Sequence, residues 1–246
     1  MDGRRNQLLC NGCYGRVLSL WEVKAGEFPD AERDDAIVNL LSASVTAEQI
    51  GWARERLAAA KLFNELSPQA QQMLATAEAV TGVLKTATGL DWSAAVIGLC
   101  KAVESEIAIR LIEPLRRATT GIDLAADLAD KDLSRVARYC AGLAPAPELG
   151  SLAHTLGAAA RSRRRVTTSP LLKVLHDMVA AWPDGRWILA TDGLMYAASR
   201  LGKEFRNPAA HTGVLSEDDY EQCRLAVQGE GGLLSRLVTA TPTQSR

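Results

Sequence analysis

The residues best suited to chemistry lie near the C-terminus, in the stretch KEFRNPAAH that ends at His211. Arg206 and His211 form an R-x-x-x-x-H pattern, and Asn207 directly follows the arginine. Histidine titrates near neutral pH and can take or give a proton at a hydroxyl, whereas arginine stays charged and binds phosphate through two parallel hydrogen bonds. These side chains suit cleavage of RNA without a metal. The histidine would activate a ribose 2′-OH, the arginine would stabilise the charge at phosphorus, and a cyclic phosphate would result.

The backbone around this pattern contains a proline, Pro208, that predicts a break in the helix. A residue before proline avoids the α region, and proline is tolerated where a helix starts. We therefore expect Arg206 to end a helix, Asn207 to cap the short turn that follows, and His211 to share one exposed rim with the arginine. The alternative interpretation is purely structural, a helix end followed by a capped restart.

The elements that would position these residues are helices. Thr46 followed by Gln49 predicts a capping box, while Ser67-Pro68, Ser169-Pro170 and Ser216 predict further helix starts. Apolar residues recur at three- and four-residue spacing between these starts, and alternation at period two never exceeds four residues. The sequence therefore predicts an all-α protein.

The domain organisation follows from where the periodicity is interrupted. Residues 1–65 begin with an irregular, glycine-interrupted stretch and continue into a helical pattern, so we expect an additional N-terminal helical segment that is either a cap or the remnant of a preceding domain. Residues 66–238 are predicted to form one helical bundle. Residues 239–246 are polar and are predicted to be a disordered tail.

Charge argues against a protein that is basic over its whole surface. The chain has 28 basic and 29 acidic residues, a net charge of −1, and therefore allows only a local basic patch. The run RSRRR supplies one, and we predict that Arg161, Arg163, Arg164 and Arg165 form a loop that contacts RNA phosphates. A charge run of this kind is also compatible with an ordinary solvated loop.

The remaining composition indicates a reduced, cytoplasmic protein without a membrane partner. The chain has five cysteines, an odd number, and neither a secretory signal nor an apolar run as long as a membrane span. Cys10-x-x-Cys13 resembles half of a zinc site, but no second pair accompanies it, so we read it as two thiols in a flexible N-terminus. We expect no metal and no cofactor.

Two stretches, together with the arginine and histidine, resemble the HEPN family (higher eukaryotes and prokaryotes nucleotide-binding domain). Ribonucleases of this family carry R-x(4–6)-H with a polar residue directly after the arginine, which Arg206, Asn207 and His211 match. The helix from Leu99 to Arg117 resembles the long acidic helix of bacterial members, and LSPQAQQMLATAEAV before it is also similar. The resemblance covers about residues 66–230, and Pro208 departs from the family pattern.

The resemblance implies a HEPN-like bundle that forms a homodimer with two motifs around one composite cleft. Glu104 or Glu106 would match the acidic position that orients Arg206. The implied activity is that of a metal-independent endoribonuclease in a prokaryotic defence or toxin setting. Many family members are inactive, so a non-catalytic module that docks on or regulates a protein effector is the alternative. A third alternative is binding of a nucleotide or small ligand at the same rim.

Overall fold

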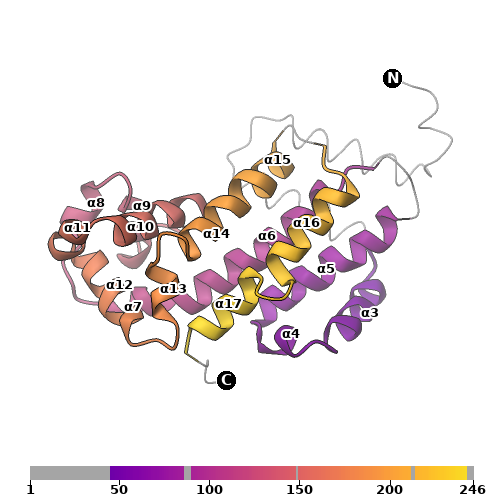
Figure 1. The fold of residues 1–246 in the computed structure, drawn as a ribbon, viewed down its shortest axis with the longest axis horizontal. Helices are drawn as coiled ribbons and strands as arrows, with labels where there is room; N and C mark the ends of the chain where they lie inside the picture. Colours follow the sequence, from indigo (N-terminus) through magenta and orange to yellow (C-terminus); the bar gives the residue numbers. More distant parts are fainter. Residues whose placement is uncertain (1–44, 86–89, 148, 212–213, 243–246) are drawn as a thin grey trace. The chain divides into compact units, whose positions relative to one another are not determined.

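The computed structural model describes residues 45–85, 90–147, 149–211 and 214–242 of the 246-residue chain (Figure 1). Within these ranges every regular element is a helix, so the predicted all-α class is confirmed. None of the described helices is long and apolar enough to cross a bilayer. The expectations for residues 1–44, including the pair Cys10 and Cys13, lie outside the described residues.

The chain falls into two compact units, each built from two segments. Unit 1 comprises Met1–Ala102 and Lys203–Val227, and unit 2 comprises Val103–Gly202 and Gln228–Arg246. Each unit is described separately below. The predicted domain boundary between residues 65 and 66 stays a prediction.

The described part of unit 1 begins with helices whose starts are fixed by hydroxyl caps. The Thr46 hydroxyl accepts a hydrogen bond from the backbone N–H of Gln49, whose side chain in turn binds the Thr46 N–H, so the predicted capping box is confirmed. The hydroxyls of Ser67 and Ser216 each accept a hydrogen bond from the backbone N–H three residues further on, which confirms these two predicted helix starts. Helix α3 packs against α5. The elements of unit 1 are α3 (Ala47–Leu57), α4 (Lys61–Glu65), α5 (Pro68–Leu84), the first part of α6 (Ser93–Ile107), η3 (Gly202–Arg206), α15 (Asn207–Ala210) and α16 (Glu217–Gln228).

The core of unit 1 joins segments that lie far apart in the sequence. Trp92 and Tyr220 are buried, and their rings lie 5.4 Å apart, centroid to centroid. The Trp92 backbone N–H donates to the Leu215 carbonyl, which fixes the start of α6 against the segment before α16. Helices α5 and α6 approach closely at Gly98, where a Cβ atom would lie 2.9 Å from that of Ala77. Trp92 thus belongs to the core of unit 1, whereas Trp52 in α3 is 53% exposed.

Unit 2 contains mostly short helices around a core of leucine, isoleucine and valine side chains. Helix α10 packs against α14, and α11 packs against α12. The chain turns tightly before α13, because a Cβ at Gly185 would lie only 1.8 Å from the Val179 carbonyl oxygen. The elements of unit 2 are the end of α6, η2 (Ala108–Ile112), α7 (Glu113–Ala118), α8 (Ala125–Ala129), α9 (Ser134–Cys140), α10 (Leu149–Arg161), α11 (Arg163–Thr168), α12 (Pro170–Ala180), α13 (Gly185–Leu189), α14 (Leu194–Leu201) and α17 (Leu233–Ala240).

Two boundaries in unit 2 differ from those expected. The basic run was predicted to be a loop, but Arg161 ends α10 and Arg163 begins α11, with the Ser162 hydroxyl as the cap between them. The disordered tail was predicted from residue 239, but α17 continues to Ala240 and Thr241 is buried. A polar residue such as Thr241 is tolerated there because its hydroxyl is hydrogen-bonded, donating to the Leu237 carbonyl.

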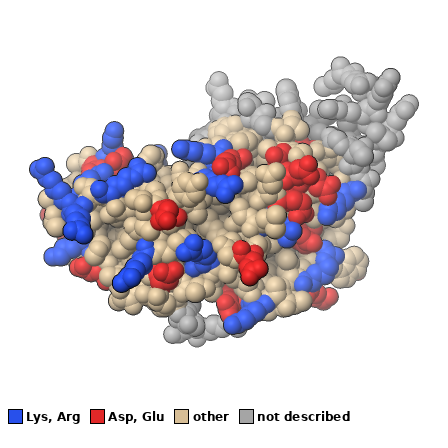
Figure 2. All heavy atoms as spheres, in the orientation of Figure 1, with Lys and Arg blue, Asp and Glu red and all other residues tan. Residues whose placement is uncertain are grey.

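Charged side chains are unevenly spread over unit 2. Figure 2 shows lysine and arginine side chains gathered over the end of this unit where Figure 1 places α8, α9 and α11. Acidic side chains also lie among them on the face shown.

Candidate functional site

The backbone that carries Arg206 does not break at the proline, which corrects the sequence-based expectation. The π-helical turn η3 ends at Arg206, and α15 continues directly from it with Arg206 still in the α region (φ −62°, ψ −48°). Pro208 lies in the first turn of α15, where a missing N–H is tolerated. The wider turn before the proline thus replaces the predicted helix end.

The side chains of Arg206 and Asn207 interact with each other. An Nη1 atom of Arg206 donates to the Oδ1 atom of Asn207 over 3.3 Å. Asn207 therefore holds the guanidinium and makes no capping bond to the backbone, which is a second correction. Arg206 is only 6% exposed, so it does not lie on an exposed rim.

His211 ends α15, five residues after the arginine. Its backbone N–H donates to the Asn207 carbonyl over 3.1 Å, which closes the single turn of this helix. The residue is half-buried. The structure therefore places the partly accessible His211 at the end of α15. The buried guanidinium of Arg206 lies at the start of this helix, where Asn207 orients it.

The two candidate glutamates lie in the part of α6 that belongs to unit 2. Glu106 is fully buried, and its Oε2 atom accepts a hydrogen bond from Nε of Arg110 over 2.5 Å. An Nη1 atom of Arg110 also donates to the Thr241 hydroxyl over 3.2 Å. Glu104 is half-buried. Glu106 thus has an arginine partner in its own unit, and a role of either glutamate in orienting Arg206 stays a prediction.

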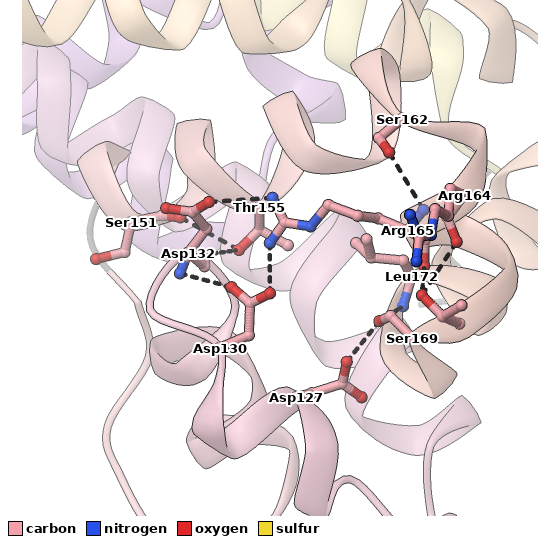
Figure 3. Close-up of polar contacts among 11 residues, drawn as sticks. Asp127, Asp130, Asp132, Ser151, Thr155, Ser162, Arg164, Arg165, Ser169 and Leu172 are labelled. Atoms are coloured by element: carbon pink, nitrogen blue, oxygen red, sulfur yellow. Dashed lines mark hydrogen bonds and ion pairs between the residues drawn. The ribbon is translucent and has the colours of Figure 1, made fainter.

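The predicted RNA-binding arginines divide into two kinds. Arg165 is held by carboxylates, since its Nη2 atom lies 2.6 Å from Asp130 and its Nη1 atom lies 3.0 Å from Asp132 (Figure 3). Arg161, Arg163 and Arg164 are exposed. We define the contact of Arg165 with both aspartates as the Arg165 clamp.

The Arg165 clamp changes the electrostatics of its members. Partial burial by itself would raise the pKa of Asp130, but hydrogen bonds from the Asp132 backbone and from Arg165 outweigh burial and lower it. Burial would likewise lower the pKa of Arg165, and the two aspartates more than offset this effect and raise it. Asp130 and Arg165 are therefore charged at neutral pH, and the clamp ties α11 to the turn before α9.

A second polar cluster in Figure 3 was not predicted from the sequence. Asp127 of α8 is buried and accepts hydrogen bonds from the Ser169 hydroxyl and from the Leu171 backbone N–H, over 2.5 and 3.0 Å. The Ser169 hydroxyl itself accepts from the Leu172 N–H, the predicted cap of α12. The dipeptide Ser169-Pro170 predicted the cap of α12. The contact of Ser169 with Asp127, 42 residues away, could not be predicted from the local sequence.

The described residues include no group of three or more histidine, cysteine, aspartate or glutamate side chains that could hold a metal ion. Comparison of the chain with models of protein families, with curated proteins and with solved structures found no match.

Proposed function

We propose that this chain is a HEPN-like helical protein that cleaves RNA without a metal ion. The observation that carries the proposal is the π-turn η3, which ends at Arg206 and leads directly into Asn207 and His211. π-Helical turns are rare and frequently accompany functional sites. Here the turn lies beside the arginine and histidine whose types and spacing suit phosphodiester cleavage.

The proposed reaction is an internal transfer at phosphorus. His211 takes the proton from a ribose 2′-OH, and the 2′ oxygen attacks the adjacent phosphorus. The bond from phosphorus to the 5′ oxygen of the next nucleotide breaks, and His211 returns its proton to this oxygen, which leaves as a 5′-hydroxyl. The products are a 2′,3′-cyclic phosphate and a 5′-hydroxyl end.

Arg206 stabilises the negative charge that develops on the phosphoryl oxygens. The hydrogen bond from Arg206 to Asn207 fixes one edge of the guanidinium. A preorganised donor of this kind typically contributes about 10²–10³-fold to a rate. A homodimer would bring two such motifs to one cleft, and a defence or toxin setting would follow from the HEPN resemblance.

The proposal is tested by incubating the purified protein with total tRNA and ribosomal RNA in EDTA. Wild type should produce fragments with cyclic phosphate ends, and His211→Ala and Arg206→Ala should each lose at least about 10²-fold in rate. His176→Ala is the matched control, because it removes an exposed histidine from α12 in unit 2. Equal cleavage by wild type and His211→Ala, or fragments with 3′-hydroxyl ends, would refute the proposed chemistry.

The burial of Arg206 favours a second candidate, a non-catalytic module that docks on a protein effector. In that case the arginine supports the fold of α15 and His211 lies at a dimer or partner interface. Arg206→Ala would then lower the midpoint of thermal unfolding by several degrees, and His211→Ala would change the oligomeric state on size exclusion. Wild type would show no cleavage in EDTA.

A further inference from the structure

Six basic side chains lie on neighbouring elements of unit 2, and we name them the basic surface. All are exposed, and none has an ion-pair partner among the described residues. The members of the basic surface are Lys131, Arg135, Arg138, Arg161, Arg163 and Arg164.

Helix α9 contributes one row of this surface. Arg135 and Arg138 lie three residues apart on its exposed face, and Lys131 lies one turn before Arg135. Val136 and Ala137, on the opposite face, are fully buried in the core. The three-residue spacing places Arg135 and Arg138 on one side of α9, about 4.5 Å apart along its axis at 1.5 Å per residue, and Lys131 lies in the turn before the helix.

The end of α10 and the start of α11 contribute the other charges, and polar contacts hold these helices near the turn that contains Lys131. Arg165 binds the aspartates on either side of Lys131. The Thr155 hydroxyl of α10 donates to the Asp132 carbonyl over 3.0 Å. Helix α10 also packs against both α9 and α11. Arg165 is thus a positioning residue for the basic surface and not itself a ligand.

We infer that the basic surface binds the phosphate backbone of a base-paired RNA stem. Five of its six cations are arginines, whose planar guanidinium matches the geometry of a phosphate. Unpaired cations on one surface raise the local positive potential, although the whole chain has a net charge of −1. The choice of RNA over DNA rests on the proposed function.

The absence of accessible aromatic rings on these elements favours a stem over a single strand. Single-strand binders stack bases on aromatic side chains, whereas double-stranded RNA is recognised through its shape and phosphates. The aromatic ring of α9, that of Tyr139, is buried and lies under the Arg116 guanidinium, with 5.2 Å between Cζ and the ring centroid. Anionic membranes would require an apolar face beside the charges. Leu143 after α9 is a single exposed leucine and does not form such a face.

The test measures binding to an RNA duplex that cannot be cleaved by the proposed chemistry. The probe is a fluorescent 20-base-pair duplex of 2′-O-methyl RNA, and anisotropy gives the dissociation constant between 50 and 300 mM salt. Arg135→Gln/Arg138→Gln and Arg163→Gln/Arg164→Gln are the test variants. The control Arg54→Gln/Arg56→Gln removes the same charge from the exposed face of α3 in unit 1.

Each test variant should weaken binding about tenfold or more near 0.1 M salt, and the slope of log K against log salt should become shallower by about 1.8, two phosphate contacts at 0.9 each. The control should bind like wild type. Test variants that bind as tightly as the control, tighter binding to a single strand, or stronger binding to phosphatidylserine vesicles would each overturn the inference.

The inference and the proposed function fail in different ways. If the protein binds the duplex through the basic surface but leaves tRNA intact in EDTA, the inference about the basic surface stands and the proposed ribonuclease activity is refuted. Cleavage that depends on His211 but is equal in all charge variants would retain the ribonuclease and refute the basic surface.

Discussion

The Arg165 clamp should make a measurable contribution to the stability of unit 2. We consider Arg165→Gln, which keeps a side chain of similar length but removes the charge and both ion pairs. The three side chains are about one third exposed, so solvent screens them, and each pair should contribute less than a buried one. Exposed pairs contribute about 0.2–1 kcal/mol each, and hydrogen bonds to charged groups up to about 1.5–3 kcal/mol. We expect a total loss of about 1–2 kcal/mol.

The loss should depend on pH in a defined direction. The pKa of Asp130 is lowered in the folded protein, so its contribution is present above the unfolded value, near 3.9. The contribution disappears as the pH falls through the lower, folded value. The difference in unfolding free energy between wild type and Arg165→Gln should therefore be constant from pH 5 to 8 and shrink below pH 4.

Urea unfolding followed by circular dichroism measures the loss of global unfolding free energy in Arg165→Gln. Hydrogen exchange of the amides in α11 measures the loss of local stability. Arg224→Gln is the matched control, because Arg224 forms a similarly exposed pair with a single carboxylate, Glu221, on its own helix. Its cost should stay below about 0.5 kcal/mol. Equal costs for the two variants, or a difference for Arg165→Gln that does not shrink as the pH is lowered below 4, would refute the argument.

Two further predictions concern the cores of the units. Glu106→Gln should destabilise unit 2 by about 3–5 kcal/mol, because it leaves the buried Arg110 guanidinium without its carboxylate, and chemical unfolding at neutral pH measures the effect. Gly185→Ala should cost roughly 3 kcal/mol or more, because its Cβ meets the Val179 carbonyl. Gly82→Ala, in an exposed and open position of α5, should instead stabilise by about 0.5–1 kcal/mol. Equal melting temperatures for the two glycine variants would contradict the described backbone contact.

Much of the helical organisation could be predicted because its signals are local. Thr46, Ser67 and Ser169 each cap a helix through a backbone N–H three residues away, so residue type and spacing were sufficient. The prediction of a loop at the basic run was wrong because a run of four arginines is typical of a solvated loop, whereas one residue within it, Ser162, caps a new helix.

The candidate site was less predictable because it depends on backbone geometry and distant contacts. Apolar periodicity assumes 3.6 residues per turn, so it could not reveal the π-turn η3. This turn ends at Arg206 and lets the helix continue through Pro208 without a break. Glu106 and Arg110 have the i,i+4 spacing of a helical ion pair, but this spacing does not reveal that both are buried or that Arg110 also donates to Thr241, 131 residues away. The side-chain types of Arg206, Asn207 and His211 were evident from the sequence, whereas the accessibility of each depended on the fold.

The basic surface has a consequence for how the molecule behaves on charged supports. The sequence gives an isoelectric point near 6.3, so at pH 7.5 the protein as a whole is slightly acidic. Ion-exchange resins respond to the face that a protein can present, however, and not only to its net charge. With Lys131, Arg135 and Arg138 all exposed on the basic surface, this chain should bind a sulfonate column at a pH above its isoelectric point and elute at a salt concentration set by these charges.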